Sequence, residues 1–141
     1  MKRTKEIELN GKTYTLTLNR ESFAQIDKIC NIRKIQTTFT KQPYEYIDEI
    51  DDNYNPLEDQ IDLGKIEKQA EEKTEALKLL CERAFFIWQY PTHGLKISEV
   101  KEILKPYFED EEKANRLVDL FFEIMDDCVK LKEDKLVDSK N

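Results

Sequence analysis

The stretch Glu8–Phe23, ELNGKTYTLTLNRESF, contains a tight turn, two alternating segments and the start of a helix. Asn10 and Gly11 tolerate the positive φ angles that both central residues of a type I′ turn require, which makes this pair the strongest short-range hairpin signal. The residues on either side alternate between apolar and polar, as in strands with one buried face. The stretch therefore predicts an antiparallel β-hairpin over residues 5–18, followed directly by a helix.

The turn fixes the register of the two strands, because it places Leu9 opposite Lys12 and Ile7 opposite Tyr14. Directly opposed residues share a face. The hairpin therefore has one apolar side, formed by Ile7, Leu9, Tyr14, Leu16 and Leu18. Two strands alone are marginally stable in water. Helices have to cover the apolar side, or a strand of another copy has to extend the sheet, which makes a homo-oligomer through the hairpin one expectation.

Favourable N-cap residues precede four segments that carry apolar residues at helical spacing. Asn19 begins the first segment, and Asn55 followed by Pro56 begins the second. Ser98 precedes the third segment, which a proline near its end stops or kinks, and Asp110 opens the fourth. We predict helices at about residues 20–31, 56–89, 98–105 and 110–131.

Length and composition place these elements in one domain. Of the 141 residues, 38% are charged, compared with roughly 25% in an average domain, and long solvated helices account for such an excess. We expect a single α+β domain over residues 1–131, with an N-terminal two-stranded β-hairpin followed by a mostly α-helical bundle of about four helices. A segment rich in Asp and Glu and free of Lys and Arg predicts an acidic loop at 42–55, and residues 132–141 predict a polar tail.

The net charge of −7 argues against a nucleic-acid binder, because it repels phosphate backbones. The N-terminus lacks the basic and apolar segments of a leader peptide, and no apolar run approaches the roughly 18 residues of a membrane span. We therefore expect a cytoplasmic protein with neither nucleic acid nor a membrane as partner. Cys30, Cys81 and Cys128 are too far apart for a close-spaced metal site and are expected to be buried as small apolar residues.

The sequence contains no motif that is typical of an enzyme active site. The alternating oxygen ligands from Asp51 onward partly match a calcium loop, but Pro56 stands where the sharp turn needs glycine and Asp62 stands where Glu is usual. His93 is the only histidine, lies in a Pro-Thr-His-Gly turn and is expected at the surface. We predict no catalytic residue, no metal site and no cofactor, so the chain is not expected to be an enzyme.

The second predicted helix is apolar on two opposite sides near its end. Leu79, Phe86 and Tyr90 lie opposite the core stripe that ends at Trp88. In one interpretation the last two helices sandwich this region and bury both sides. In the other, the second side is a partly exposed groove that receives a partner helix, with Leu120 lining the same region. Under the second interpretation Leu79, Phe86, Tyr90 and Leu120 are the candidate partner-binding residues.

The opening of the chain also resembles that of a known family. The sequence ELNGKTY of residues 8–14 continues through Leu16 and Leu18 into a helix that carries Phe23 and Ile26. This pattern is similar to the start of tail assembly chaperones of long-tailed bacteriophages and gene transfer agents, which are also small, acidic and mostly helical. The resemblance implies a non-enzymatic protein that keeps the helical tape-measure protein soluble and helps to recruit the tail-tube protein.

Two alternatives from other functional classes remain open. An acidic inhibitor that mimics DNA with its carboxylates would bind a nuclease or DNA-binding protein in a salt-sensitive manner. A structural tail component would persist in finished particles, whereas a chaperone would be absent from them.

Overall fold

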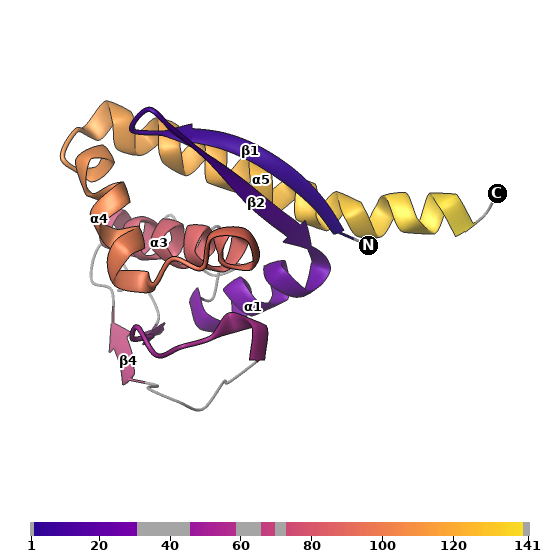
Figure 1. Ribbon diagram of the computed structural model, residues 1–141, viewed down its shortest axis with the longest axis horizontal. Helices are drawn as coiled ribbons and strands as arrows, with labels where there is room; N and C mark the ends of the chain where they lie inside the picture. The colour runs from indigo at the N-terminus through magenta and orange to yellow at the C-terminus, as the bar shows by residue number, and fades with distance from the viewer. Residues whose placement is uncertain (1, 31–45, 59–65, 70–72, 140–141) are drawn as a thin grey trace.

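The computed structural model describes residues 2–30, 46–58, 66–69 and 73–139. The fold is α+β, with an antiparallel hairpin at the N-terminus followed by helices, as predicted (Figure 1). In chain order the elements are β1 Lys2–Leu9, β2 Lys12–Asn19, α1 Arg20–Cys30, β3 Tyr46–Glu49, the 3₁₀ turn η1 Pro56–Glu58, β4 Ile66–Gln69, α3 Lys73–His93, α4 Ile97–Phe108 and α5 Glu111–Ser139.

The hairpin has the predicted turn and register. Asn10 and Gly11 have φ angles of 55° and 78°, as a type I′ turn requires. Leu9 pairs with Lys12 and Ile7 pairs with Tyr14. The apolar side is buried, with exposed fractions of 6% or less for Ile7, Leu9, Tyr14, Leu16 and Leu18.

Helix α1 begins at the predicted cap. The Ser22 backbone N–H donates a hydrogen bond of 2.6 Å to Oδ1 of Asn19, and the Ser22 hydroxyl donates one of 2.7 Å to the Asn19 carbonyl. The first of these bonds satisfies a backbone N–H that the first turn of a helix otherwise leaves without a partner. The chain therefore passes from β2 into α1 without a loop (Figure 1).

Helix α3 forms the centre of the molecule and packs against β2, α1, α4 and α5 (Figure 1). Every residue from Leu79 to Gln89 is buried. The Tyr14 ring of β2 meets the Phe85 ring edge-on at 5.2 Å between centroids, and the Trp88 ring meets Phe121 of α5 at 5.7 Å. These aromatic contacts join the hairpin, α3 and α5 into one core.

The predicted helix over residues 56–89 is wrong in its first part. Pro56 begins only the 3₁₀ turn η1, and α3 starts at Lys73 and continues through Pro91 to His93. The predicted acidic loop at 42–55 contains the strand β3, which pairs antiparallel with β4. The remaining residues of that loop before Tyr46 lie outside the described residues.

The predicted bounds of the last two helices also need correction. Helix α4 starts at Ile97 with Lys96 as its N-cap instead of Ser98, because the Glu99 carboxylate accepts a hydrogen bond of 2.8 Å from the Lys96 N–H. The helix then continues past Pro106 to Phe108. Helix α5 extends to Ser139, so most of the predicted polar tail at 132–141 is helical.

None of the helices in the described part of the chain combines the length and the apolar character that a membrane crossing needs.

Candidate functional site

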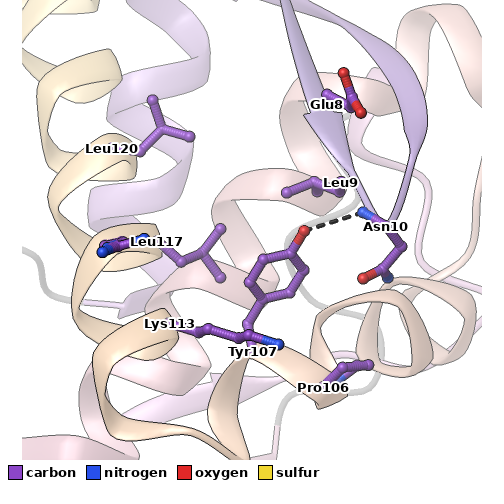
Figure 2. Close-up of a pocket in the computed structure, with 9 residues that line it drawn as sticks. Glu8, Leu9, Asn10, Pro106, Tyr107, Lys113, Leu117 and Leu120 are labelled. Atoms are coloured by element: carbon purple, nitrogen blue, oxygen red, sulfur yellow. Dashed lines mark hydrogen bonds between the residues drawn. The ribbon is translucent and has the colours of Figure 1, made fainter.

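An open pocket lies where the tip of the hairpin meets the end of α4 and the first half of α5 (Figure 2). Its volume is about 300 Å³, which is at the small end of the range for ligand pockets. The pocket is lined by Glu8, Leu9, Asn10, Pro106, Tyr107, Lys113, Arg116, Leu117 and Leu120. The hairpin tip thus builds one concave surface with two helix segments that lie about a hundred residues later in the sequence.

The floor of the pocket is apolar. Leu9 is 2% exposed and Leu117 is 3% exposed, while Tyr107 and Leu120 are half-buried. The Tyr107 ring lies between Leu117 and Asn10 (Figure 2). Because Leu9 and Leu117 belong to the hydrophobic core, the core itself holds the floor in place, and the pocket exists before anything binds.

Two hydrogen bonds fix the hairpin tip on α4. The Asn10 backbone N–H donates to Oη of Tyr107 at 3.0 Å (Figure 2). The Asn10 side-chain Nδ2 donates to the carbonyl of Ile103 at 2.9 Å. Asn10 therefore has two roles, because it adopts the positive φ that the turn requires and also attaches the turn to α4.

The rim of the pocket is charged and exposed. Lys113 and Arg116 lie on the α5 side, and Glu8 lies on β1. Arg116 forms an ion pair of 2.6 Å with Glu112, with both side chains more than 70% exposed. Water and salt screen such a pair strongly. The rim therefore keeps the pocket solvated and adds little binding energy of its own.

The lining suits the binding of an apolar side chain better than a reaction. It contains one carboxylate, Glu8, and no Ser, Cys or His that could act as a nucleophile or base. Its apolar floor and polar rim match the arrangement at protein interfaces, where a large side chain of one partner enters a pocket of the other. Among the described residues, no group of three or more His, Cys, Asp or Glu is placed to hold a metal ion.

The four candidate partner-binding residues do not lie on one exposed surface. Leu120 lines the pocket. Phe86 is 1% exposed and Leu79 is 8% exposed, and Tyr90 is half-buried with its ring 5.4 Å from that of Phe86. The expectation of a partly exposed groove at Leu79, Phe86 and Tyr90 is therefore corrected, because the fold covers this side of α3.

Part of the cover comes from the acidic segment. We call residues 50–58 the strap. Ile50, Tyr54 and Pro56 of the strap are buried, and the Tyr54 ring lies 6.1 Å from that of Phe86. The strap carries the large apolar side chains that the second side of α3 needs, which explains why this side is not open to solvent.

Asp52 attaches the strap to the first turn of α4. Its carboxylate accepts hydrogen bonds from the Ser98 backbone N–H at 3.0 Å and from the Ser98 hydroxyl at 2.8 Å. The backbone bond from Ser98, followed by the hydroxyl bond, lowers the pKa of Asp52 below its usual value. A carboxylate at this position is also favoured by the positive end of the helix dipole.

His93 has a structural role that the sequence did not indicate. It is half-buried instead of lying at the surface, and its Nε2 accepts a hydrogen bond of 2.9 Å from the Thr15 backbone N–H. Cys81 and Cys128 are buried, as predicted, and burial raises the pKa of Cys128 to about 11. The side chain of Cys30 is not among those that the structure describes.

The sequence reasoning named Leu120 but missed the rest of the pocket. Leu9 and Leu117 were expected in the core, and they are core residues that also form the floor. Tyr107 had no signal, because its role depends on meeting a turn that is far away in the sequence. Comparisons of the chain with protein families, curated proteins and solved structures found no match.

Proposed function

We propose that this chain is a non-enzymatic tail assembly chaperone that works in the cytoplasm, holds the tape-measure protein soluble and helps to recruit the tail-tube protein. The observation that carries the proposal is the open apolar pocket between Leu9, Tyr107, Leu117 and Leu120. The resemblance of the hairpin and first helix to this family gives independent support.

The chemistry of the pocket suits the proposed partner. An amphipathic helix presents apolar side chains three and four residues apart, and such a side chain can enter a pre-formed pocket while its neighbours pack on the rim. The net charge of −7 keeps the complex in solution, because like-charged complexes repel one another.

Co-expression with a tape-measure protein tests the proposal. The wild-type chain should raise the soluble fraction of the tape-measure protein and co-purify with it. Leu120→Asp should abolish both effects, because it places a charge in the apolar pocket. Leu57→Asp is the matched control, since Leu57 is 64% exposed and does not line the pocket. Failure of the wild-type chain to bind or solubilise the tape-measure protein would contradict the proposal.

Finished particles separate the chaperone from the structural alternative. A chaperone is expected to be absent from purified tails, and a tail component is expected to be present in them. The acidic-inhibitor alternative gains no support from the described acidic residues of the strap. Asp52 bonds to Ser98 and Asp51 accepts a hydrogen bond from Asn53, so these two carboxylates serve the fold of the chain itself.

A further inference from the structure

The strap contacts three helices through two of its side chains. The ring of Tyr54 packs near Phe86 of α3, and its hydroxyl accepts a hydrogen bond of 2.8 Å from Nε2 of Gln25 on α1. The Asp52 carboxylate receives two hydrogen bonds from Ser98 on α4. We call the surface formed by Gln25, Phe86 and Ser98 the strap site. It recognises a carboxylate and, two residues later, an aromatic ring.

The strap is organised by bonds within itself. The Tyr54 N–H donates to the Asp51 carbonyl at 3.1 Å, and the Leu57 N–H donates to Oδ1 of Asn55 at 2.9 Å. The described sheets pair β1 with β2 and β3 with β4, and no residue of the strap belongs to either. The strap therefore docks through side chains and through the Pro56 carbonyl, which accepts a hydrogen bond of 3.4 Å from Nε2 of Gln25, instead of through a backbone ladder. A segment of this kind can detach as a unit while the helices stay folded.

We propose that the strap is a built-in occupant of the strap site, and that a partner protein displaces it with a segment carrying an acidic residue two positions before an aromatic residue. The structure itself supplies the argument for this partner chemistry, because the acidic-x-aromatic pattern of Asp52 and Tyr54 is what the site holds. The partner's carboxylate takes the two donors of Ser98, and its ring takes the place of Tyr54 against Phe86.

A partner segment of this kind makes the same contacts with the strap site that the strap makes. The partner has to overcome only the advantage that the strap has from being part of the same chain, which acts as a high local concentration. When no partner is present, the strap keeps Phe86 at 1% exposure, which prevents an exposed apolar surface that would favour aggregation. The site is thus protected until a matching segment binds.

A trans-binding experiment tests the proposal directly. The probe is a blocked peptide that copies residues 50–58, IDDNYNPLE. The variant Asp52→Ala/Tyr54→Ala empties the strap site and should bind the peptide at least tenfold more tightly than the wild-type chain, as measured by NMR titration. The matched control is Asn53→Ala/Leu57→Ala, which changes two exposed side chains of the strap and should bind as weakly as wild type.

The same titration contains the results that would overturn the proposal. An emptied variant with a native circular dichroism spectrum that binds the peptide no better than wild type would show that the site takes no segment in trans. A peptide with alanine at the positions of Asp52 and Tyr54 should not bind, and equal binding of both peptides would also overturn the proposal. Dimerisation of the wild-type chain by exchange of straps would show that a second copy, and not another protein, is the partner.

Amide exchange provides a second measurement that uses only the wild-type chain. The Ser98 N–H is held by the strap, whereas the Lys96 N–H at the same helix end is held by Glu99 of α4 itself. Exchange of the Ser98 amide should be nearly independent of low denaturant concentration, since local release exposes little surface. If the Ser98 amide instead shows the denaturant dependence of the α3 core amides, the strap leaves only on global unfolding and the proposal fails.

This inference does not depend on the proposed chaperone function. The strap site and the pocket at Leu120 have no residue in common. Leu120→Asp should therefore leave peptide binding by the emptied variant unchanged, even where it abolishes tape-measure binding. Loss of one activity without the other distinguishes failure of either proposal.

Discussion

His93, the last residue of α3, accepts a hydrogen bond of 2.9 Å at Nε2 from the backbone N–H of Thr15 in β2. The imidazole also meets the Tyr14 ring edge-on at 5.4 Å. Because an N–H faces Nε2, this nitrogen has to carry no proton, and the imidazole acts as an acceptor for the outer edge of β2. The end of the central helix is thereby attached to the middle of the hairpin.

His93→Phe should lower the free energy of unfolding by about 1–2 kcal/mol, because the ring is kept while the partly buried Thr15 N–H loses its acceptor. Urea unfolding at neutral pH measures the change. Thr92→Ala is the control, since Thr92 is exposed and should change the stability by less than about 0.5 kcal/mol. Equal stability of His93→Phe and wild type would show that water replaces the histidine without cost.

Asn10→Ala should be clearly more destabilising than Asn10→Gly. Both variants lose the side-chain bond to Ile103, but only alanine is strained at the φ of 55°, at a cost of about 1–2 kcal/mol. The difference between the unfolding free energies of the two variants, measured by thermal or urea unfolding, gives the cost of backbone strain at this position. Indistinguishable stabilities would mean that the turn changes its conformation when Asn10 is replaced.

The contribution of Asp52 to stability should depend on pH in a defined window. Its pKa in the folded chain is below the usual 3.8 because the Ser98 N–H, and then its hydroxyl, bond to the carboxylate. The stabilisation is therefore complete above the unfolded pKa and is lost as the pH falls through the lower folded value. Urea unfolding at pH 6 and pH 3 should show a larger difference between wild type and Asp52→Asn at pH 6. Glu102→Gln is the control for an exposed carboxylate on α4, and an equal effect of Asp52→Asn at both pH values would contradict the prediction.

Phe86→Ala should lower the free energy of unfolding by about 3–5 kcal/mol, as expected for a buried phenylalanine. The interpretation of Leu79 and Phe86 as part of an exposed groove implies a small cost, and the burial of both side chains overturns it. Tyr90→Ala, at a half-buried position of the same helix, should cost less. A Phe86→Ala variant that melts at the wild-type temperature would show that this side of α3 is not core.

The Cys128 thiol should react with a disulfide reagent at pH 8 only when the chain unfolds. Burial raises its pKa from 9.0 to about 11, so the thiolate is scarce in the folded chain. The same shift stabilises the fold fully below pH 9, and this contribution is lost as the pH rises towards 11. Mass-spectrometric mapping of labelled cysteines in native buffer and in urea measures the difference. Rapid native labelling of Cys128 would contradict its burial.

Local signals in the sequence identify the hairpin and the first helix. The pair Asn10-Gly11 determines the turn and thereby the register, and Asn19 caps α1 through Ser22. In both cases the determining contacts join residues that are close in the sequence. The stripe of α5 was predictable for the same reason, because Leu117, Phe121 and Cys128 recur at helical spacing and are buried.

The acidic segment shows why the rest could not be predicted. Asn55 followed by Pro56 has the chemistry of a helix start, yet Pro56 is buried and the turn ends after three residues. Strands β3 and β4 have four residues each, which is too short for an alternating pattern to be recognised. Their pairing, like the docking of Tyr54 on Phe86, depends on contacts between distant parts of the chain.

The residues of the candidate site also differ in whether the sequence alone could reveal them. Leu120 could be named because it falls off the main stripe of its helix, which marks a side chain that the core does not use. Tyr107 could not be named, because its role comes from a hydrogen bond to Asn10, which lies 97 positions away in the sequence. The misassignment of Phe86 has the opposite cause, because helix periodicity cannot reveal that a non-helical strap supplies a cover.

The edges of the hairpin carry features that disfavour its extension by another strand. His93 occupies the outer edge of β2 at Thr15, and the outer strand β1 presents exposed Arg3, Glu6 and Glu8. A foreign strand that tried to extend the sheet along β1 would have to strip water from these charges. A homo-oligomer through the hairpin, which stays a prediction, would meet the same barrier. Both edges of the hairpin therefore disfavour ribbon-like self-association of the chain.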